Sequence, residues 1–447
     1  MKKVLLVCLA LIIALSSMFT GCTDPATQGD ESATPPRDKN TVAIWWSQEA
    51  GDLRIINDAW YDFYELYTKG EEKKYSEEIK MFTFPGDPGG TTTLEMQIAG
   101  GTAPDLVKMD HVYITALGQK GNVLDLNEKF QANETIKDLF IESCWESSSY
   151  KAATYGIPFD ANTIIWGGKK EALDNAGVQL PTTYEQMLDV GGKLKALNLG
   201  ENVYPYTLPC GTDTRFNWPA FVFMFYVWRL GGDVVNMEDN DGDGYPDMDK
   251  AIFNNSETGV RALQMMIEMK DAGLISPTEY QEGGSVLCDY GTWRLNTFTE
   301  GMEFDLLPSL KDGGERWSGL GLFSLSVVST AMNKELAYDF AVHLATGKNS
   351  MSDEYYQYTF TKSHSLLPSL KAATETSNFK TETQTKFWEV SIEQLELSKY
   401  RPAVPCWPGI EELLSKAVSD ALNGVKEPTE ALNTAAKAAD EMLAQYR

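Results

Sequence analysis

The sequence predicts an α/β protein with two lobes, each a mostly parallel sheet flanked by helices. Strand-like segments alternate with helix-like segments along most of the 447 residues, which is typical of parallel sheets joined by crossover helices. The roughly 400 residues that follow residue 40 are too many for one compact core. A hydrophobic content of 43% supports globular folding.

Residues 1–21 predict an export signal of the lipoprotein kind. Lys2 and Lys3 precede an apolar run from Val4 to Leu15, and small residues stand just before Cys22. The run is shorter than the roughly 20 apolar residues that a membrane-spanning helix needs. The alternative is a buried helix with an incidental cysteine. We expect cleavage before Cys22 and acylation of its side chain, with palmitate for example.

Residues 22–40 are predicted to form the acylated cysteine and a flexible tether. Residues 23–40 contain no large apolar side chain, so this segment cannot bury enough surface to offset its ordering entropy. The sequence therefore predicts an extracytoplasmic protein that is anchored to the cell membrane through lipidated Cys22.

The first elements of the folded part are short strands and amphipathic helices. Leu53, Ile56, Trp60 and Phe63 share one face of the first helix. Strands are predicted at 41–46, 79–84, 105–109 and 163–166, and helices at 52–67, near 181–197 and at 218–228. The carboxyl end predicts helices at 411–423, closed by Gly424, and at 428–445, opened by Pro428.

The formal net charge of −26 argues against nucleic acid and anionic lipid head groups as partners. Beyond Cys22 the mature chain has Cys144, Cys210, Cys288 and Cys406 without metal-ligand spacing. Four cysteines allow three disulfide pairings or none, and all of these alternatives stay open.

Several motifs, taken in order, resemble a known family. They are Gln97–Asp105 (QIAGGTAPD), Gly121–Leu126 (GNVLDL), Tyr155–Pro158 (YGIP), Asn333–Phe340 (NKELAYDF) and Leu367–Ser369 (LPS). Each is weak alone, but their common order is similar to the extracellular solute-binding proteins (family 1, carbohydrate type) of bacterial ATP-binding-cassette importers.

The resemblance implies a class II periplasmic-binding-protein fold with a ligand cleft between two hinged lobes. It implies crossings near 159–163, 322–325 and 366–370, with residues 41–160 and 323–366 in the first lobe and 161–322 and 367–447 in the second. It also implies a monomer that captures a sugar or oligosaccharide and delivers it to the permease subunits, without catalysis.

Sugars present hydroxyls and apolar ring faces, so their sites need carboxylates, amides, arginines and aromatic rings. Trp45 and Trp46 end the first strand, where ligands collect in open sheets; one of the two should face the core. Asp110 follows the third strand, and the resemblance places a sugar-binding carboxylate there, although a solvated loop residue is the alternative. Asp160 and Asn162 fall at the first crossing, where turn capping is the alternative.

The second lobe supplies the other candidate ligand-binding residues. Trp218 begins an aromatic helix, and relatives carry a tryptophan at that point. Further candidates are Asp289, Tyr290, Trp293 and Arg294, near the Gly-Ser-Trp turn of relatives, and Trp407. Core packing is the alternative for the tryptophans and the preferred interpretation for Trp407; a surface ion pair is the alternative for Arg294.

A calcium site is predicted in the segment 239–247. Asp239, Asp241, Asp243 and Asp247 occupy positions 1, 3, 5 and 9 of a calcium loop, and Tyr245 offers its backbone carbonyl at position 7. Position 12, normally glutamate, is Lys250. An acidic solvent loop without a cation is the alternative, and the predicted role of calcium is structural.

No enzyme motif is present in the sequence. His111, His343 and His364 lack zinc-ligand spacing, and neither a nucleophile elbow nor a phosphate-binding loop occurs. A glycoside hydrolase, which needs only two carboxylates, and a surface adhesion protein are the alternatives to a transport receptor.

Overall fold

The computed structural model describes residues 38–46, 50–84, 91–131, 135–200, 203–207, 217–275, 285–293, 301–375 and 382–446. Residues 37–447 form one compact unit. Cys22 and Arg294 lie outside the described residues, and so does the side chain of Tyr290. Among the helices that the structure describes, none combines the length and the apolar character needed to cross a bilayer.

The larger sheet has seven strands in the order β12-β6-β11-β3-β1-β2, with β13 added beside β11. β1 pairs in parallel with β2 and β3, while β11 runs antiparallel to β3 and β6. The strands are β1 (Thr41–Trp45), β2 (Lys80–Phe84), β3 (Leu106–Asp110), β6 (Ile157–Asn162), β11 (Ser318–Val327), β12 (Leu367–Pro368) and β13 (Ser398–Tyr400).

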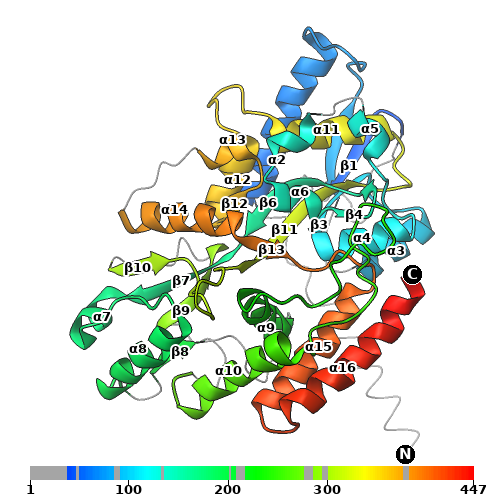
Figure 1. Ribbon diagram of the computed structural model, residues 1–447. Coiled ribbons are helices and arrows are strands. Elements are labelled where there is room, and N and C mark those ends of the chain that lie inside the picture. Colours follow the sequence, from blue (N-terminus) through cyan, green and yellow to red (C-terminus); the bar gives the residue numbers. More distant parts are fainter. Residues whose placement is uncertain are drawn as a thin grey trace, which may run out of the picture. The chain divides into compact units, whose positions relative to one another are not determined.

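Helices around this sheet complete the first lobe (Figure 1). Asn333 caps the helix that packs on β11 and β6, because its side chain accepts a hydrogen bond from Leu336 N at 3.0 Å. The helices are α2 (Ala50–Tyr64), α3 (Thr91–Gly100), α4 (His111–Gln119), α5 (Asn127–Gln131), α6 (Glu142–Glu146), α11 (Lys334–Thr346), α12 (Tyr356–His364) and α13 (Lys371–Thr374). A small hairpin, β4 (Ser149–Tyr150) and β5 (Ala153–Thr154), lies between α6 and β6 along the chain.

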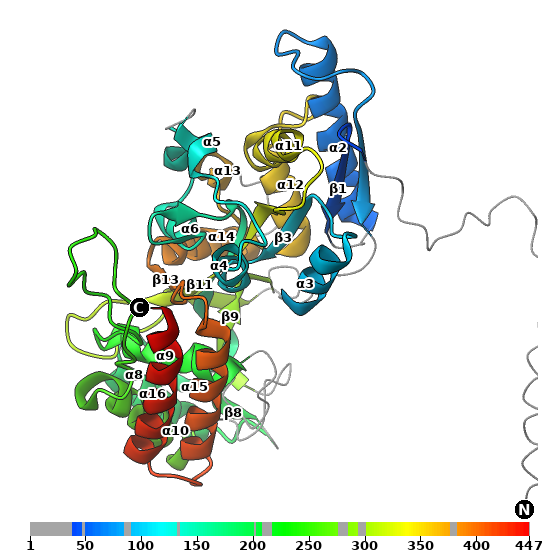
Figure 2. The ribbon, with the colours of Figure 1, turned by 90° about the vertical axis from the view of Figure 1, so that its right-hand side faces the viewer.

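The smaller sheet forms the second lobe and has the order β10-β7-β9-β8. Its strands are β7 (Ile164–Lys169), β8 (Tyr204–Thr207), β9 (Ser285–Gly291) and β10 (Met302–Asp305). Its helices are α7 (Lys170–Ala176), α8 (Tyr184–Ala196), α9 (Trp218–Arg229), α10 (Arg261–Asp271), α14 (Glu382–Glu396), α15 (Trp407–Leu422) and α16 (Pro428–Leu443). Figure 2 shows α15 and α16 side by side near α10.

The two-lobed α/β prediction is confirmed, but both sheets are mixed rather than mostly parallel. β7 pairs antiparallel with β9 and β10, because β7 continues directly from β6 instead of arriving through a crossover helix. The predicted crossing near 366–370 contains β12. β12 at Leu367–Pro368 still pairs with β6, whereas α14 packs on β7 and β10.

Three buried hydroxyl groups hold the chain segments that run between the sheets. Thr163 follows β6, Ser318 begins β11 and Ser398 begins β13. Thr163 Oγ1 lies 3.1 Å from Ser318 Oγ and 2.6 Å from Ser398 Oγ. Ser318 Oγ also donates to Ile164 O at 2.8 Å. These bonds join segments that are distant in sequence, at the start of the chain stretches between the two sheets.

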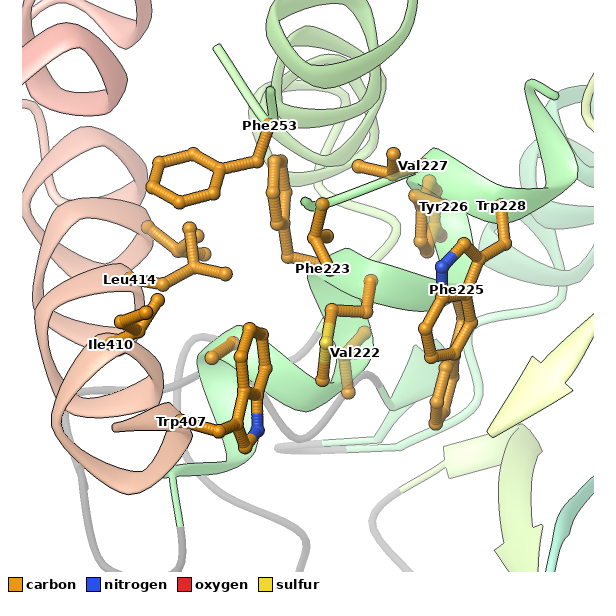
Figure 3. Close-up of a cluster of buried hydrophobic side chains, with 14 of the residues drawn as sticks. Val222, Phe223, Phe225, Tyr226, Val227, Trp228, Phe253, Trp407, Ile410 and Leu414 are labelled. Carbon is orange, nitrogen blue, oxygen red and sulfur yellow. The ribbon is translucent and has the colours of Figure 1, made fainter. Parts of the chain in front are cut away.

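The second-lobe core is dominated by aromatic side chains of α9. Helix α9 carries Pro219 in its first turn, where the missing N–H has no intrahelical partner to lose. Figure 3 shows Phe223 and Val222 of α9 facing Leu414 and Trp407 of α15. Because nearly every side chain of α9 is buried, the helix is fixed tightly, and its first residue, Trp218, is held at a defined place.

Candidate functional site

One face of β11 forms the centre of the candidate site. Residues 319, 321 and 323 share this face because side chains alternate along a strand. A Cβ at Gly319 would come within 2.2 Å of the Phe225 ring, and one at Gly321 within 2.3 Å of Asn162 Oδ1. The two glycines thus leave room for the Phe225 ring and the Asn162 amide. Phe323, the next residue on this face, is partly exposed.

Asp110 lies beside Phe323 and is held by an arginine from a distant segment. Arg401 Nη2 donates to both carboxylate oxygens of Asp110 at 2.8 Å. His111 Nδ1 lies 3.1 Å from Asp110 Oδ1, and Asp110 also accepts a hydrogen bond from Val112 N as the N-cap of α4. Burial alone would raise the pKa of Asp110, but the charge of Arg401 and the His111 contact hold it well below its ordinary value.

Arg401 connects this carboxylate to the second lobe. Its Nη1 lies 3.7 Å from Glu411 Oε1 of α15, and its guanidinium lies 5.7 Å from the centre of the Phe221 ring of α9. Burial raises the pKa of Glu411, although the charge of Arg401 opposes this shift. Because Asp110 extends from the first lobe, the arginine bridges elements of both lobes.

Lys108 and Asp160 form a second charged pair on the other side of Phe323. Lys108 Nζ lies 2.6 Å from Asp160 Oδ2 and 4.3–5.0 Å from the ring centres of Phe360, Phe323 and Trp46. Asp160 is completely buried, and burial raises its pKa despite the ammonium of Lys108. The structure therefore places Asp160 beneath the site as a partner of Lys108, and not at a surface that a sugar reaches.

Trp218 and Trp293 meet at the edge of the site. Trp218 begins α9 and Trp293 follows the end of β9. Their ring centres lie 5.8 Å apart with planes inclined by 43°, and both side chains are partly exposed. The Trp218 ring also contacts Phe221 edge-on at 5.7 Å. Two inclined, partly exposed indoles suit stacking against the apolar faces of sugar rings.

Asp289 lies four residues before Trp293 on β9, opposite Trp166 of β7. Its Oδ2 is buried and has no hydrogen-bond partner among the described residues. Burial raises the pKa of Asp289 to about 7, and the charge of Arg229 limits the shift. The protonation state of this buried carboxyl group therefore changes near neutral pH.

Three predicted tryptophans lie in the core. Trp45 is 2% exposed and contacts Phe84 at 5.8 Å, and Trp46 is 1% exposed and contacts Phe159 at 4.9 Å. We expected one of these two to face the core and left the other open. Both are buried because β1 lies between β2 and β3 with side chains packed on both faces. Trp407 is fully buried against α9 (Figure 3).

The structure thus brings together Asp110, Asn162, Trp218 and Trp293 of the predicted residues. It adds residues that the sequence analysis missed, namely Lys108, Phe221, Phe323, Arg401 and Glu411. No motif marks these five in the sequence. Gly319 and Gly321, which alternate along the strand before Phe323, are the one signal that could have indicated that other side chains approach this strand closely.

Three of the four predicted calcium-loop carboxylates lie close together, two of them exposed and Asp247 partly exposed. Ligand oxygens of Asp239, Asp241 and Asp247 lie within 4.8 Å of one another. Backbone N–H groups of Gly242 and Gly244 donate to Asp239 at 2.7 and 3.0 Å. These residues fit the oxygen-rich donor set of calcium, and calcium binding stays a prediction.

The described cysteines do not form a disulfide with one another. Cys144, Cys288 and Cys406 are buried, and Cys210 lies outside the described residues. Burial raises the pKa of the Cys406 thiol to about 11, so this side chain is a neutral packing group at neutral pH.

Comparison with known proteins extends over nearly the whole chain. Residues 66–386 match a family model described as bacterial extracellular solute-binding protein. The galactooligosaccharide-binding protein of Bacillus subtilis is 22% identical over 96% of this chain and 95% of its own length. A maltooligosaccharide ABC transporter solute-binding lipoprotein of Streptococcus pneumoniae is 21% identical over 93% of both chains.

Solved structures share the fold. The cyclic α-maltosyl-1,6-maltose binding protein from Arthrobacter globiformis superposes with a TM-score of 0.71 at 19% identity, covering 91% of this chain and 99% of that one. The maltose-bound MalE3 of T. maritima has a TM-score of 0.67 at 18% identity and covers 90% and 99%.

Proposed function

Because the chain belongs to the bacterial extracellular solute-binding protein family, we propose that it captures a saccharide between its two lobes and delivers it to the permease of an ATP-binding-cassette importer. Members of this family bind a solute and do not transform it, so the glycoside hydrolase alternative is not retained. The adhesion alternative also fails, because it gives no reason for a two-lobed receptor fold.

The observation that carries the proposal is the inclined Trp218–Trp293 pair, which Phe221 links to the Asp110–Arg401 ion pair. Aromatic faces and polar groups next to each other are what a polyhydroxylated ring requires. Relatives named for galactooligosaccharide, arabinooligosaccharide and maltooligosaccharide binding support an oligosaccharide over a monosaccharide.

The proposed cell location is the outer face of the cell membrane, with acylated Cys22 as the anchor. The lipoprotein relative from Streptococcus pneumoniae supports this proposal, and so does the apolar segment before Cys22. The protein is proposed to act as a monomer, with the permease subunits as its partners.

Isothermal titration calorimetry against a panel of neutral oligosaccharides tests the proposal. We expect one saccharide to bind with 1:1 stoichiometry, and Trp218→Ala and Trp293→Ala each to weaken it by about tenfold or more, since 1.4 kcal/mol corresponds to tenfold. Trp60→Phe is the matched control, because Trp60 is a partly buried tryptophan of α2 that packs on Phe63 and Phe340. Binding that survives both alanine variants would contradict the proposal, and so would product formed from the saccharide.

A further inference from the structure

The backbone just before Trp218 has an unusual conformation. Asn217, the N-cap of α9, has φ 53° and ψ 32°, which is the left-handed region that residues other than glycine rarely adopt. An N-cap residue normally has an extended backbone, and its side chain accepts a hydrogen bond from an N–H group of the first turn. The Asn217 side chain makes no such bond within α9, whose residues are all described. Another contact therefore has to hold this conformation.

The side chain of Asn217 is directed instead to a buried carboxylate of α15. Its amide donates a hydrogen bond to Glu411, which is 5% exposed. Glu411 lies one helical turn after Trp407 and three residues before Leu414, on the face of α15 that packs against α9 (Figure 3). Because this part of α15 is fixed in the second-lobe core, Glu411 is a rigid partner for Asn217.

Glu411 is itself held by the arginine that binds Asp110. Arg401 Nη1 lies 3.7 Å from Glu411 Oε1, and Arg401 Nη2 donates to both oxygens of Asp110. Burial raises the pKa of Glu411, whereas the charge of Arg401 and the hydrogen bond from Asn217 oppose this shift. The two groups that stabilise the Glu411 carboxylate thus lie next to the two ends of the candidate site: one carries Asp110 and the other precedes Trp218.

The ring of Trp218 inherits its place from this backbone. Trp218 directly follows Asn217, so the φ and ψ angles of Asn217 set the direction in which the first turn of α9 begins. The ring reaches Trp293 at 5.8 Å and Phe221 at 5.7 Å, and Phe221 lies 5.7 Å from the guanidinium of Arg401. The orientation of the Trp218 ring therefore depends on the backbone of Asn217 as well as on its aromatic neighbours.

We propose that Glu411 is a positioning residue of the saccharide site: it holds Asn217 in its left-handed conformation and so sets the orientation of Trp218 relative to Trp293. The inference rests on the proposed saccharide-binding function. Because Glu411 is buried between α9 and α15, it acts on the saccharide through Trp218 and not by contact. Its loss should therefore weaken binding only while Trp218 is present.

Circular dichroism of the protein without saccharide tests the geometry. Two indoles 5.8 Å apart couple their electronic transitions, and the resulting signal depends on the angle between them. The difference between each protein and its Trp293→Phe counterpart isolates this signal. We expect Glu411→Leu, which cannot accept a hydrogen bond, to lose most of the difference signal. Glu411→Gln should keep it, because the amide oxygen of glutamine still accepts the bond from Asn217.

Asn217→Gly tests the same contact from the other side. Glycine adopts the left-handed backbone without strain but has no side chain for Glu411, so the difference signal should fall as in Glu411→Leu. Asn198→Gly is the matched control, because Asn198 has φ 52° at an exposed position after α8. We expect the control variant to keep the signal. Thermal melting curves confirm that each variant is folded.

Calorimetry with maltotriose, a neutral oligosaccharide, measures the consequence for binding. We expect Glu411→Leu and Asn217→Gly each to weaken binding about fivefold or more, and Glu411→Gln less than about twofold. In a Trp218→Ala background, Glu411→Leu should add no further loss, since both changes then act on the same contact.

Three outcomes would overturn the proposal. An unchanged difference signal in Glu411→Leu would show that the carboxylate does not orient the indole. Equal losses of signal in Asn217→Gly and Asn198→Gly would show an effect of glycine that is unrelated to Glu411. A further loss of maltotriose affinity in the Trp218→Ala background would show that Glu411 acts by another route. The dichroism result needs no saccharide, so it can fail independently of the proposed function.

Discussion

Arg401 Nη2 donates hydrogen bonds to both oxygens of Asp110 at 2.8 Å, although 291 residues separate the two positions. The side chains are only 13% and 23% exposed, so the pair is largely removed from water. This contact joins the strand β3 of the first lobe to the segment leading into α15 of the second.

The first prediction concerns the stability of this pair. Arg401→Met should lower the free energy of unfolding by about 3 kcal/mol, because it leaves the Asp110 carboxylate without its counter-charge. Asp110→Asn keeps the helix cap, and the double variant should lose less than the sum of the single losses. Urea unfolding measures all three. Strictly additive losses would show that the two residues are not coupled.

The second prediction concerns Gly321. A Cβ there would meet Asn162 Oδ1 at 2.3 Å, so Gly321→Ala should displace the Asn162 amide from its place over β11. Because a flexible side chain can move, we expect the stability to fall by less than about 1 kcal/mol. Saccharide affinity should fall as far in Gly321→Ala as in Asn162→Ala, and no further in the double variant. A Gly321→Ala protein with unchanged affinity would remove Asn162 from the site.

The third prediction concerns pH and Asp289. The pKa of this carboxyl is raised to about 7 in the folded protein, above its ordinary value near 3.8. Between these values the folded state holds more protons than the unfolded state, so stability falls as pH rises, by up to about 1.4 kcal/mol per pH unit. The Asp289→Asn variant has no titrating carboxyl group at this position, so its stability lacks this dependence on pH.

The stability difference between Asp289→Asn and the parent protein should therefore grow between pH 4 and 7 in favour of the variant, and stay constant above pH 7. Thermal melts at half-unit pH intervals measure it. A difference that does not change with pH would mean that the folded state does not raise the pKa of Asp289.

The fourth prediction concerns the hydroxyl cluster between the sheets. Thr163→Val keeps the shape of the side chain but removes its hydrogen bonds to Ser318 and Ser398. Unsatisfied buried hydroxyls should lower the free energy of unfolding by about 1–3 kcal/mol. Thr434→Val on the exposed face of α16 is the control, with an expected change within about 0.5 kcal/mol. Equal changes in the two variants would contradict a role for the cluster.

The fifth prediction concerns calcium. If the Asp239 loop binds calcium, millimolar Ca²⁺ should raise the melting temperature and a chelator should reverse the rise, since a ligand of the folded state stabilises it. Asp239→Asn should abolish the rise, because both oxygens of Asp239 organise the loop. Asp174→Asn, an exposed position on α7, should not. A melting temperature that does not change with calcium would show that the segment is an acidic surface loop without a cation.

Local patterns in the sequence were sufficient for most elements of the fold. The apolar spacing of 52–67 predicted α2, and Pro428 marked the first residue of α16. Periodicity is a property of neighbouring residues, so it can be read without the fold. Strand direction is not local, and the antiparallel pairing of β7 with β9 and β10 was missed for that reason.

Which residues form the candidate site depended on contacts between distant segments. The strand alternation correctly placed Trp45 and Trp46 on opposite faces of β1, but it could not show that side chains cover both faces. Trp218 and Trp293 were each predicted, yet their meeting at 5.8 Å depends on where α9 packs against β9. Phe323 and Arg401 carried no motif that could have identified them.

The amino-acid order by itself predicted an export signal and a tether, and it determined the succession of strands and helices and the kinds of side chain available to hold a sugar. Folding decided which of them lie within reach of one another, because burial and ion pairing are set by neighbours brought from remote parts of the chain. Asp160 shows the difference: its identity suggested a ligand contact, and its position beneath Lys108 made it a buried counter-ion.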